Sequence, residues 1–161
     1  HWKRLLTLNS VASVAMVGLF ISQFFLVTAG EPIPSGPIKG TTLVIEFDGL
    51  DNTKGKILAA LYNVPATFPK EGKEFKPLEA KPSVTMKGTI RVTGLAPGDY
   101  AVAAMYDKNG NGKMDFKLLA IPSEKYGFSN NVRPGLLGPP SFSKAKFRIQ
   151  GSECRIRITL K

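Results

Sequence analysis

Short apolar runs, interrupted by Gly, Pro and Asn, set the pattern of the chain from Thr41 onward. Such runs between turn-forming residues are typical of β-strands, and no stretch of about ten residues repeats apolar positions with the period of a helix. The pattern predicts an all-β domain over residues 41–161, an antiparallel β-sandwich of immunoglobulin-like or transthyretin-like build. The expected strands are Thr42–Phe47, Lys56–Tyr62, Ser83–Lys87, Thr89–Thr93, Tyr100–Tyr106, Lys144–Ile149 and Glu153–Leu160.

The last two expected strands have the most regular alternation. Apolar and basic residues alternate up to Ile149, and the turn formers Gln150–Ser152 follow, so we expect a hairpin with one solvated face. Cys154 falls on the apolar face of the second strand, which predicts a buried structural thiol. As the only cysteine, it excludes an intrachain disulfide and a cysteine cluster for zinc. Two segments without a pattern, Val64–Pro82 and Lys117–Ser143, are expected to be long loops.

An uncharged apolar run from Leu5 to Ala29 precedes the domain and follows the basic pair Lys3-Arg4. A helix of about 20 residues crosses the ~30 Å hydrocarbon core of a membrane, and flanking basic residues stay on the cytoplasmic side. We therefore expect residues 1–30 to form one uncleaved transmembrane helix, with its N-terminus in the cytoplasm and the domain exported. The alternative is a cleaved signal peptide, because small residues at Val27–Ala29 suit a signal peptidase.

The segment between helix and domain, residues 31–40, contains three prolines. Proline disfavours a helix, so we expect an extended linker that holds the domain just off the membrane. Within the expected helix, Gly18 and Ser22 have the small-xxx-small spacing that lets two membrane helices approach closely. These two residues are the candidate contact with another membrane subunit.

The chain is basic, with a formal net charge of +10, and all 12 acidic residues lie after position 30. A basic surface attracts anionic lipid head groups or acidic partners, whereas scattered lysines also serve only solubility. Here the lysines are spread from Lys39 to Lys161 without a dense run. Nucleic acid is not an expected partner, because no basic motif is interleaved with aromatic residues and export removes the domain from it.

The sharpest local motif is the segment Asp107–Asp115. Oxygen-bearing side chains at alternate positions, with a glycine at the sixth, resemble the first part of a calcium-binding loop. Leu118 stands where a bidentate Glu is expected, so an Asn-Gly turn without a metal is the alternative. The candidate calcium ligands are Asp107, Asn109, Asn111, the backbone carbonyl of Lys113, and Asp115.

A second motif brings aromatic, amide and hydroxyl groups together near the C-terminal third of the chain. Such a mixture is typical of a ligand cleft or a partner surface, and equally of a loop that packs on itself. The candidate binding residues are Tyr126, Phe128, Ser129, Asn130, Asn131 and Phe142.

Residues for catalysis are scarce. The only histidine is His1, before the apolar run, so no Ser–His or Cys–His pair and no histidine metal site is expected in the domain. The carboxylates of Glu46, Asp48 and Glu124 have no spacing that pairs them for acid–base chemistry. We therefore do not expect an enzyme.

Several of these motifs, in this order, resemble an uncharacterised family of exported bacterial proteins, domain of unknown function 2141. The resemblance spans roughly Thr41 to Leu160 and implies a small periplasmic β-domain without an established ligand. The motifs are Gly55–Leu58, Leu61–Asn63, Phe68-Pro69, Gly94–Val102, Asp107–Asp115, Ile121–Asn131 and Gly138–Phe142.

With the apolar run, this resemblance predicts a single-pass protein of the bacterial inner membrane whose main domain lies in the periplasm. We expect an accessory or structural subunit that docks on a larger membrane complex, with photosynthetic and respiratory complexes as natural hosts. The alternative is a non-catalytic module that binds calcium or a small ligand. Co-purification with other subunits in fixed stoichiometry favours the first function, and a saturable soluble ligand favours the second.

Overall fold

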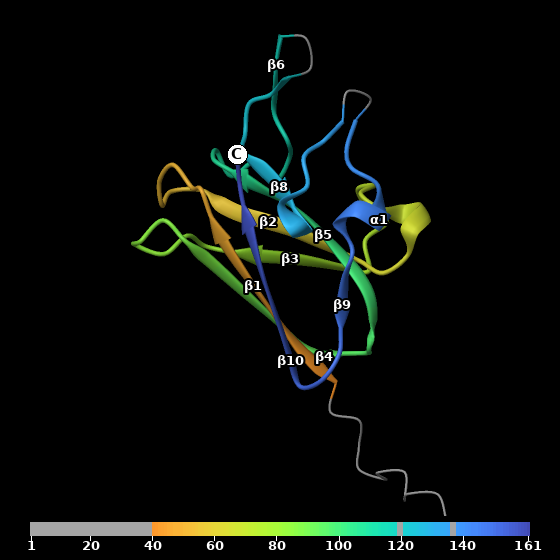
Figure 1. The fold of residues 1–161 in the computed structure, drawn as a ribbon. Coiled ribbons are helices and arrows are strands. Elements are labelled where there is room, and N and C mark those ends of the chain that lie inside the picture. Colours follow the sequence, from red (N-terminus) through yellow and green to blue (C-terminus); the bar gives the residue numbers. More distant parts are fainter. Residues whose placement is uncertain (1–39, 119–120, 136–137) are drawn as a thin grey trace, which may run out of the picture. The chain divides into compact units, whose positions relative to one another are not determined.

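Short strands joined by turns and loops form the part of the chain that Figure 1 draws in colour. This computed structural model describes residues 40–118, 121–135 and 138–161. The expected transmembrane helix over residues 1–30, with Gly18 and Ser22, lies outside the described residues, as does the linker before Gly40. Within the described ranges, no helix is long and apolar enough to cross a membrane.

The first sheet has three strands, in the order β10-β1-β4. Its members are β1 (Thr41–Asp48), β4 (Gly88–Leu95) and β10 (Glu153–Thr159). β1 is antiparallel to β4 but parallel to β10, with Thr42 opposite Glu153. This parallel pair corrects the expectation of a wholly antiparallel sandwich. Parallel neighbours need a long crossover, and here the crossover is nearly the whole domain.

The second sheet has the order β3-β2-β5-β8, and β9 pairs with the beginning of β5 on the edge that β8 uses farther along. Two very short strands form a separate ribbon, and short helical turns lie between strands. The bounds are β2 (Lys56–Tyr62), β3 (Lys76–Ala80), β5 (Gly98–Asp107), β8 (Tyr126–Phe128), β9 (Phe147–Ile149), the ribbon β6 (Phe116–Lys117) and β7 (Ile121–Pro122), and the turns η1 (Pro65–Thr67), η3 (Ser129–Asn131) and α1 (Phe142–Ala145).

The main core lies between the inner faces of the two sheets, which gives a β-sandwich-like fold. Alternation decides which side chains enter it, because every second residue of a strand points to the same face. Burial of these apolar side chains drives the two sheets together. The contributors include Leu43, Ile45, Phe47, Ile57, Leu61, Ile90, Val92, Val102, Tyr106, Ile149 and Ile158.

A second, smaller apolar cluster covers part of the outer face of the second sheet. It consists of Tyr62, Phe68, Ala101, Phe128, Phe142 and Ala145, all buried. Phe68 lies at its centre, with ring centroids 5.2 Å from Tyr62, 6.1 Å from Phe128 and 6.0 Å from Phe142. Edge-to-face aromatic contacts of this kind hold the η1 and α1 turns on the sheet.

Several strand predictions match, and β2 matches at both ends. The predicted hairpin is wrong, because β9 pairs with β5 and β10 pairs with β1. Periodicity reports which face of a strand is buried, and it says nothing of the partner strand. Two further strand predictions also fail: Ser83–Lys87 is a turn outside the strands, and the first residues of Lys144–Ile149 belong to α1.

Cys154, near the start of β10, is a free thiol and only partly buried. It packs against the main core together with Ile156, and burial raises the pKa of its thiol. The side chain thus lies on the inner face, as the alternation predicts, but less deeply than a fully buried core residue.

Candidate functional site

Both the inner and the outer face of the second sheet are apolar. β2 reads Lys-Ile-Leu-Ala-Ala-Leu-Tyr, and β5 likewise continues apolar residues from Tyr100 to Tyr106. A strand with one solvated face alternates apolar and polar residues, whereas a run without polar residues indicates that both faces are covered. Here the second cluster covers one end of the outer face and leaves the rest open.

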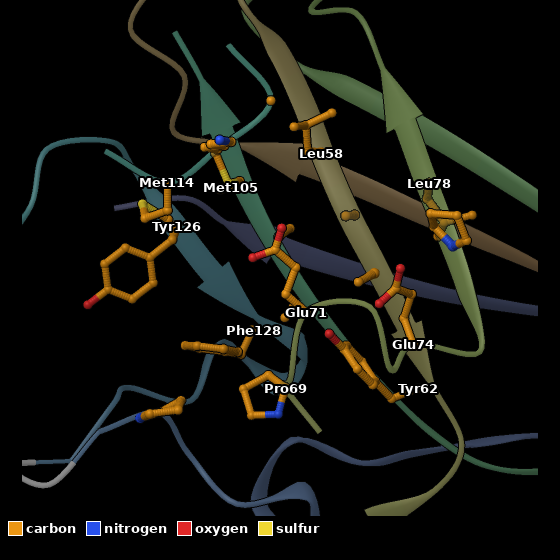
Figure 2. Close-up of a pocket in the computed structure, with 18 of the residues that line it drawn as sticks. Leu58, Tyr62, Pro69, Glu71, Glu74, Leu78, Met105, Met114, Tyr126 and Phe128 are labelled. Atoms are coloured by element: carbon orange, nitrogen blue, oxygen red, sulfur yellow. The ribbon is translucent and has the colours of Figure 1, made fainter. Parts of the chain in front are cut away.

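An open groove of about 800 Å³ lies on this uncovered part of the face. Its volume falls in the range of pockets that hold small molecules. Figure 2 shows side chains from the strands and from the preceding and following loops surrounding it. Its lining includes Leu58, Ala60, Tyr62, Glu71, Glu74, Pro77, Glu79, Ala103, Met105, Lys113, Met114, Tyr126 and Phe128.

The floor of the groove follows from the register of the strands. Residues opposite each other on neighbouring strands share a face, so each row of the sheet contributes adjacent side chains. One row consists of Glu79, Leu58, Met105 and Tyr126, and the next of Pro77, Ala60, Ala103 and Phe128. The paired alanines make the second row low, which deepens the groove at its middle.

Flexible and aromatic side chains supply the walls. Met105 rises from the floor, and Met114 faces it from the loop that follows β5 (Figure 2). Tyr126 and Phe128 stand on β8 with ring centroids 6.0 Å apart. Methionine adapts its shape to what it touches and makes favourable contacts with aromatic rings, so this wall suits apolar ligands of more than one shape.

A few polar groups reach the otherwise apolar groove. Glu71, Glu74 and the phenol of Tyr62 lie at the end formed by the segment after η1. The Tyr62 hydroxyl donates to the carbonyl oxygen of Lys70 at 3.2 Å. Burial, with the nearby Glu74 and Glu71 carboxylates, raises the pKa of Tyr62 to about 12. This phenol therefore stays neutral over the physiological range.

The Asp107–Asp115 loop, which closes the other end of the groove, is organised around one carboxylate. Asp107 is 1% exposed, and it accepts backbone N–H bonds from Gly110 at 2.7 Å, Asn111 at 3.2 Å and Gly112 at 2.8 Å. Gly110 and Gly112 have φ of 77° and 76°, a conformation that glycine adopts at no steric cost. Their backbone amides therefore turn inward toward the carboxylate.

The other candidate calcium ligands also find partners inside the chain. The Asn109 side-chain amide donates to Asp115 Oδ2 at 2.6 Å, and that of Asn111 donates to Asp115 Oδ1 at 3.1 Å. Asn111 Oδ1 accepts the N–H of Lys113 at 2.8 Å. The structure thus brings together all five predicted ligand residues, in a hydrogen-bonded turn. The described ranges contain no group of three or more His, Cys, Asp or Glu side chains that could hold a metal ion.

Glu124, from outside the Asp107–Asp115 loop, binds the backbone of that loop. The sequence does not predict this contact. Glu124 is 8% exposed, and its two oxygens accept N–H bonds from Lys108 at 2.8 Å and Asp115 at 3.3 Å. A buried carboxylate with two backbone donors clamps both ends of the loop. Glu124 lies outside the loop in the sequence, and no pattern in the residues between them predicts this contact.

The six candidate binding residues of the C-terminal third divide into two sets. Tyr126 and Phe128 line the groove, and Phe142 is buried in the second cluster. The polar members make internal hydrogen bonds instead. Ser129 donates to the Ala145 carbonyl at 2.6 Å, the Asn130 amide donates to the Lys146 carbonyl at 2.8 Å, and Asn131 Oδ1 accepts the Thr159 N–H at 2.8 Å. These bonds match the self-packed alternative for the loop.

The sequence analysis does not predict most of the groove, although a signal exists. Leu58, Ala60, Ala103 and Met105 occupy positions at which a sheet with one solvated face carries polar residues. Their apolar character is the pattern that marks a covered or ligand-binding outer face.

Comparison with known proteins identifies a family. A family model described as an uncharacterized protein conserved in bacteria (DUF2141) matches residues 45–157, more than half of the chain. No curated protein and no solved structure gives a significant match.

Proposed function

The chain belongs to the DUF2141 family of bacterial proteins, and from this premise we propose that its β-domain is a non-catalytic module that binds a small apolar molecule in the groove. The observation that carries the proposal is the open apolar groove of about 800 Å³ on the outer face of the second sheet. Large exposed apolar patches on soluble domains mark binding sites. The absence of a histidine after His1 in the sequence supports a role without catalysis.

The proposed location is the periplasmic side of the bacterial inner membrane. Its support is the uncharged run from Leu5 to Ala29, which suits an uncleaved membrane helix with residues 31–40 as a linker. We also propose that the sandwich-like fold is of the immunoglobulin-like or transthyretin-like type.

The test uses the full chain in phosphatidylcholine nanodiscs and the neutral probe 4-phenylbutanol. Ala103→Leu fills the low middle of the groove, and we expect it to abolish saturable probe binding measured by calorimetry. Thr93→Leu places the same side chain at an exposed site of β4 in the other sheet and should leave binding intact. Equal binding by the parent and by Ala103→Leu contradicts the proposal.

A second candidate function is an accessory subunit of a larger membrane complex, either photosynthetic or respiratory. The observation that favours it is the small-xxx-small pair Gly18 and Ser22 within the apolar run. Native purification in mild detergent should then recover other subunits in fixed stoichiometry, and Gly18→Leu should weaken that association. Unchanged association of Gly18→Leu argues against this helix contact.

A further inference from the structure

In the segment from Lys70 to Lys76, which leads from η1 into β3, acidic and basic side chains lie on different sides. Its sequence, Lys-Glu-Gly-Lys-Glu-Phe-Lys from Lys70 to Lys76, alternates basic and acidic residues. Both glutamates line the groove, whereas none of the three lysines does. Figure 2 shows the side chains of Glu71 and Glu74 extending over the strands beside Tyr62. The segment therefore presents carboxylates to the groove and ammonium groups to solvent.

The charge of the groove is opposite to that of the chain. Its charged lining residues are three acidic ones, Glu71, Glu74 and Glu79, and one basic one, Lys113. Glu79 forms an ion pair with Lys56 at 3.1 Å. Neither Glu71 nor Glu74 takes part in an ion pair within the described ranges. A groove with net negative charge attracts cations, although the protein as a whole is basic.

Aromatic rings line the groove near these carboxylates. Tyr62 lies beside them on β2, and Phe128 lines the groove from β8, on the other side of β5 (Figure 2). Burial first, and then the Glu74 and Glu71 carboxylates, raises the pKa of the Tyr62 phenol. An ammonium group near aromatic rings is attracted by their negative faces in addition to any carboxylate. The polar end of the groove thus combines two kinds of group that favour a cation.

Resting on the proposed function, we propose that the groove binds a small apolar amine: an apolar body lies on the Ala60–Met105 floor, and a protonated amine meets Glu71 and Glu74. Charge complementarity selects this ligand over a fatty acid, because a carboxylate at this end would face two like charges. The interaction is a charge-assisted hydrogen bond, which is stronger than a hydrogen bond between neutral groups.

Three probes that share one apolar body test the proposal: 4-phenylbutylamine, 4-phenylbutanol and 4-phenylbutyrate. Each is titrated into the full chain in phosphatidylcholine nanodiscs, with empty nanodiscs as background. Methyl signals of ¹³C-labelled methionine report the site, because Met105 and Met114 line the groove and Met86 does not. We expect the amine to bind about tenfold more tightly than the alcohol, and the butyrate to bind most weakly.

The variant Glu71→Gln/Glu74→Gln should remove the preference for the amine and keep the affinity for the alcohol. Glu153→Gln, which removes a carboxylate from the other sheet, should leave the preference unchanged. Equal affinities for amine and alcohol in the parent overturn this inference and leave the proposed function standing. Methionine signals that respond to none of the probes overturn both.

Discussion

The two outer faces of the sandwich differ in how they meet solvent. On the first sheet, Glu46 pairs with Arg155 at 2.8 Å and with Arg157 at 3.1 Å, and Arg91 pairs with Glu153 at 3.3 Å. On the second sheet, the corresponding positions of β2 and β5 hold apolar side chains that line a groove. Both faces cover the same core, so stability does not require them to differ. Exposing the apolar face to water is the less favourable arrangement, and this cost is the reason that we propose a binding role for it.

The largest expected effect concerns the aromatic cluster beside the groove. Phe68→Ala removes the ring that contacts Tyr62, Phe128 and Phe142, and we expect a loss of about 3 kcal/mol in the free energy of unfolding. Arg155→Ala on the charged face should destabilise much less, since exposed ion pairs contribute little. Urea denaturation measures the free energy of unfolding of both variants. Equal losses would contradict the expected difference between the two faces.

A second prediction concerns the loop that closes the groove. Asp107→Ala leaves three backbone N–H groups without their acceptor, so we expect a loss of roughly 2 kcal/mol. Thermal unfolding in millimolar calcium and in chelator separates the two interpretations of this loop. A loss of the same size in both conditions indicates a hydrogen-bonded turn. If calcium raises the Tm of the parent and not of the variant, the loop is instead an ion site.

A third variant gives the apolar face the character of the charged one. Leu58→Lys places an ammonium group on the half-buried floor of the groove next to Met105. We expect the affinity for 4-phenylbutanol to fall about tenfold, because the lysine brings water into the groove, with stability within about 1 kcal/mol of the parent. Thr89→Lys on the exposed part of β4 is the matched control. If Leu58→Lys binds 4-phenylbutanol as tightly as the parent, the probe does not bind on the apolar face.

The smallest effect belongs to the charged face. Hydrogen bonds from Arg155 and then Arg157 lower the pKa of Glu46 from its ordinary 4.5. A lowered folded-state pKa contributes stability above the unfolded value, and this stability is lost as pH falls through the folded value. Glu46→Gln should therefore destabilise slightly at pH 7, and its difference from the parent should shrink below pH 4.5 and in high salt. A difference that is constant with pH would contradict the ionic origin.

The strands that the sequence predicts are those with a long pattern of their own. β1, β2, β4, β5 and β10 all appear within two residues of their predicted bounds. β3 and β8 were missed because Pro77 and Gly127 interrupt their short runs, and both residues weaken a strand pattern. Their existence depends on the neighbouring strands that pair with them, which no local pattern reports.

For the candidate site, the sequence predicts the loop and part of one wall. The segment Asp107–Asp115 is local, so its turn formers and acceptors are visible in one stretch of residues. The groove instead combines residues of β2, β5 and β8 with Glu71 and Glu74, and their meeting depends on register. Tyr126 and Phe128 were found through their aromatic character, whereas Ala60 and Ala103 matter through the space that they leave open.

The parallel pair β1–β10 has a mechanical consequence. A force applied at Gly40 and at Lys161 pulls the two strands along their length in opposite directions. Seven residue pairs, from Thr42 with Glu153 to Asp48 with Thr159, then share the load together. In an antiparallel terminal hairpin the bonds would instead open one after another from the loaded end. A domain fixed at its N-terminal end and pulled by its last strand should therefore rupture in one event at high force, which single-molecule stretching measures.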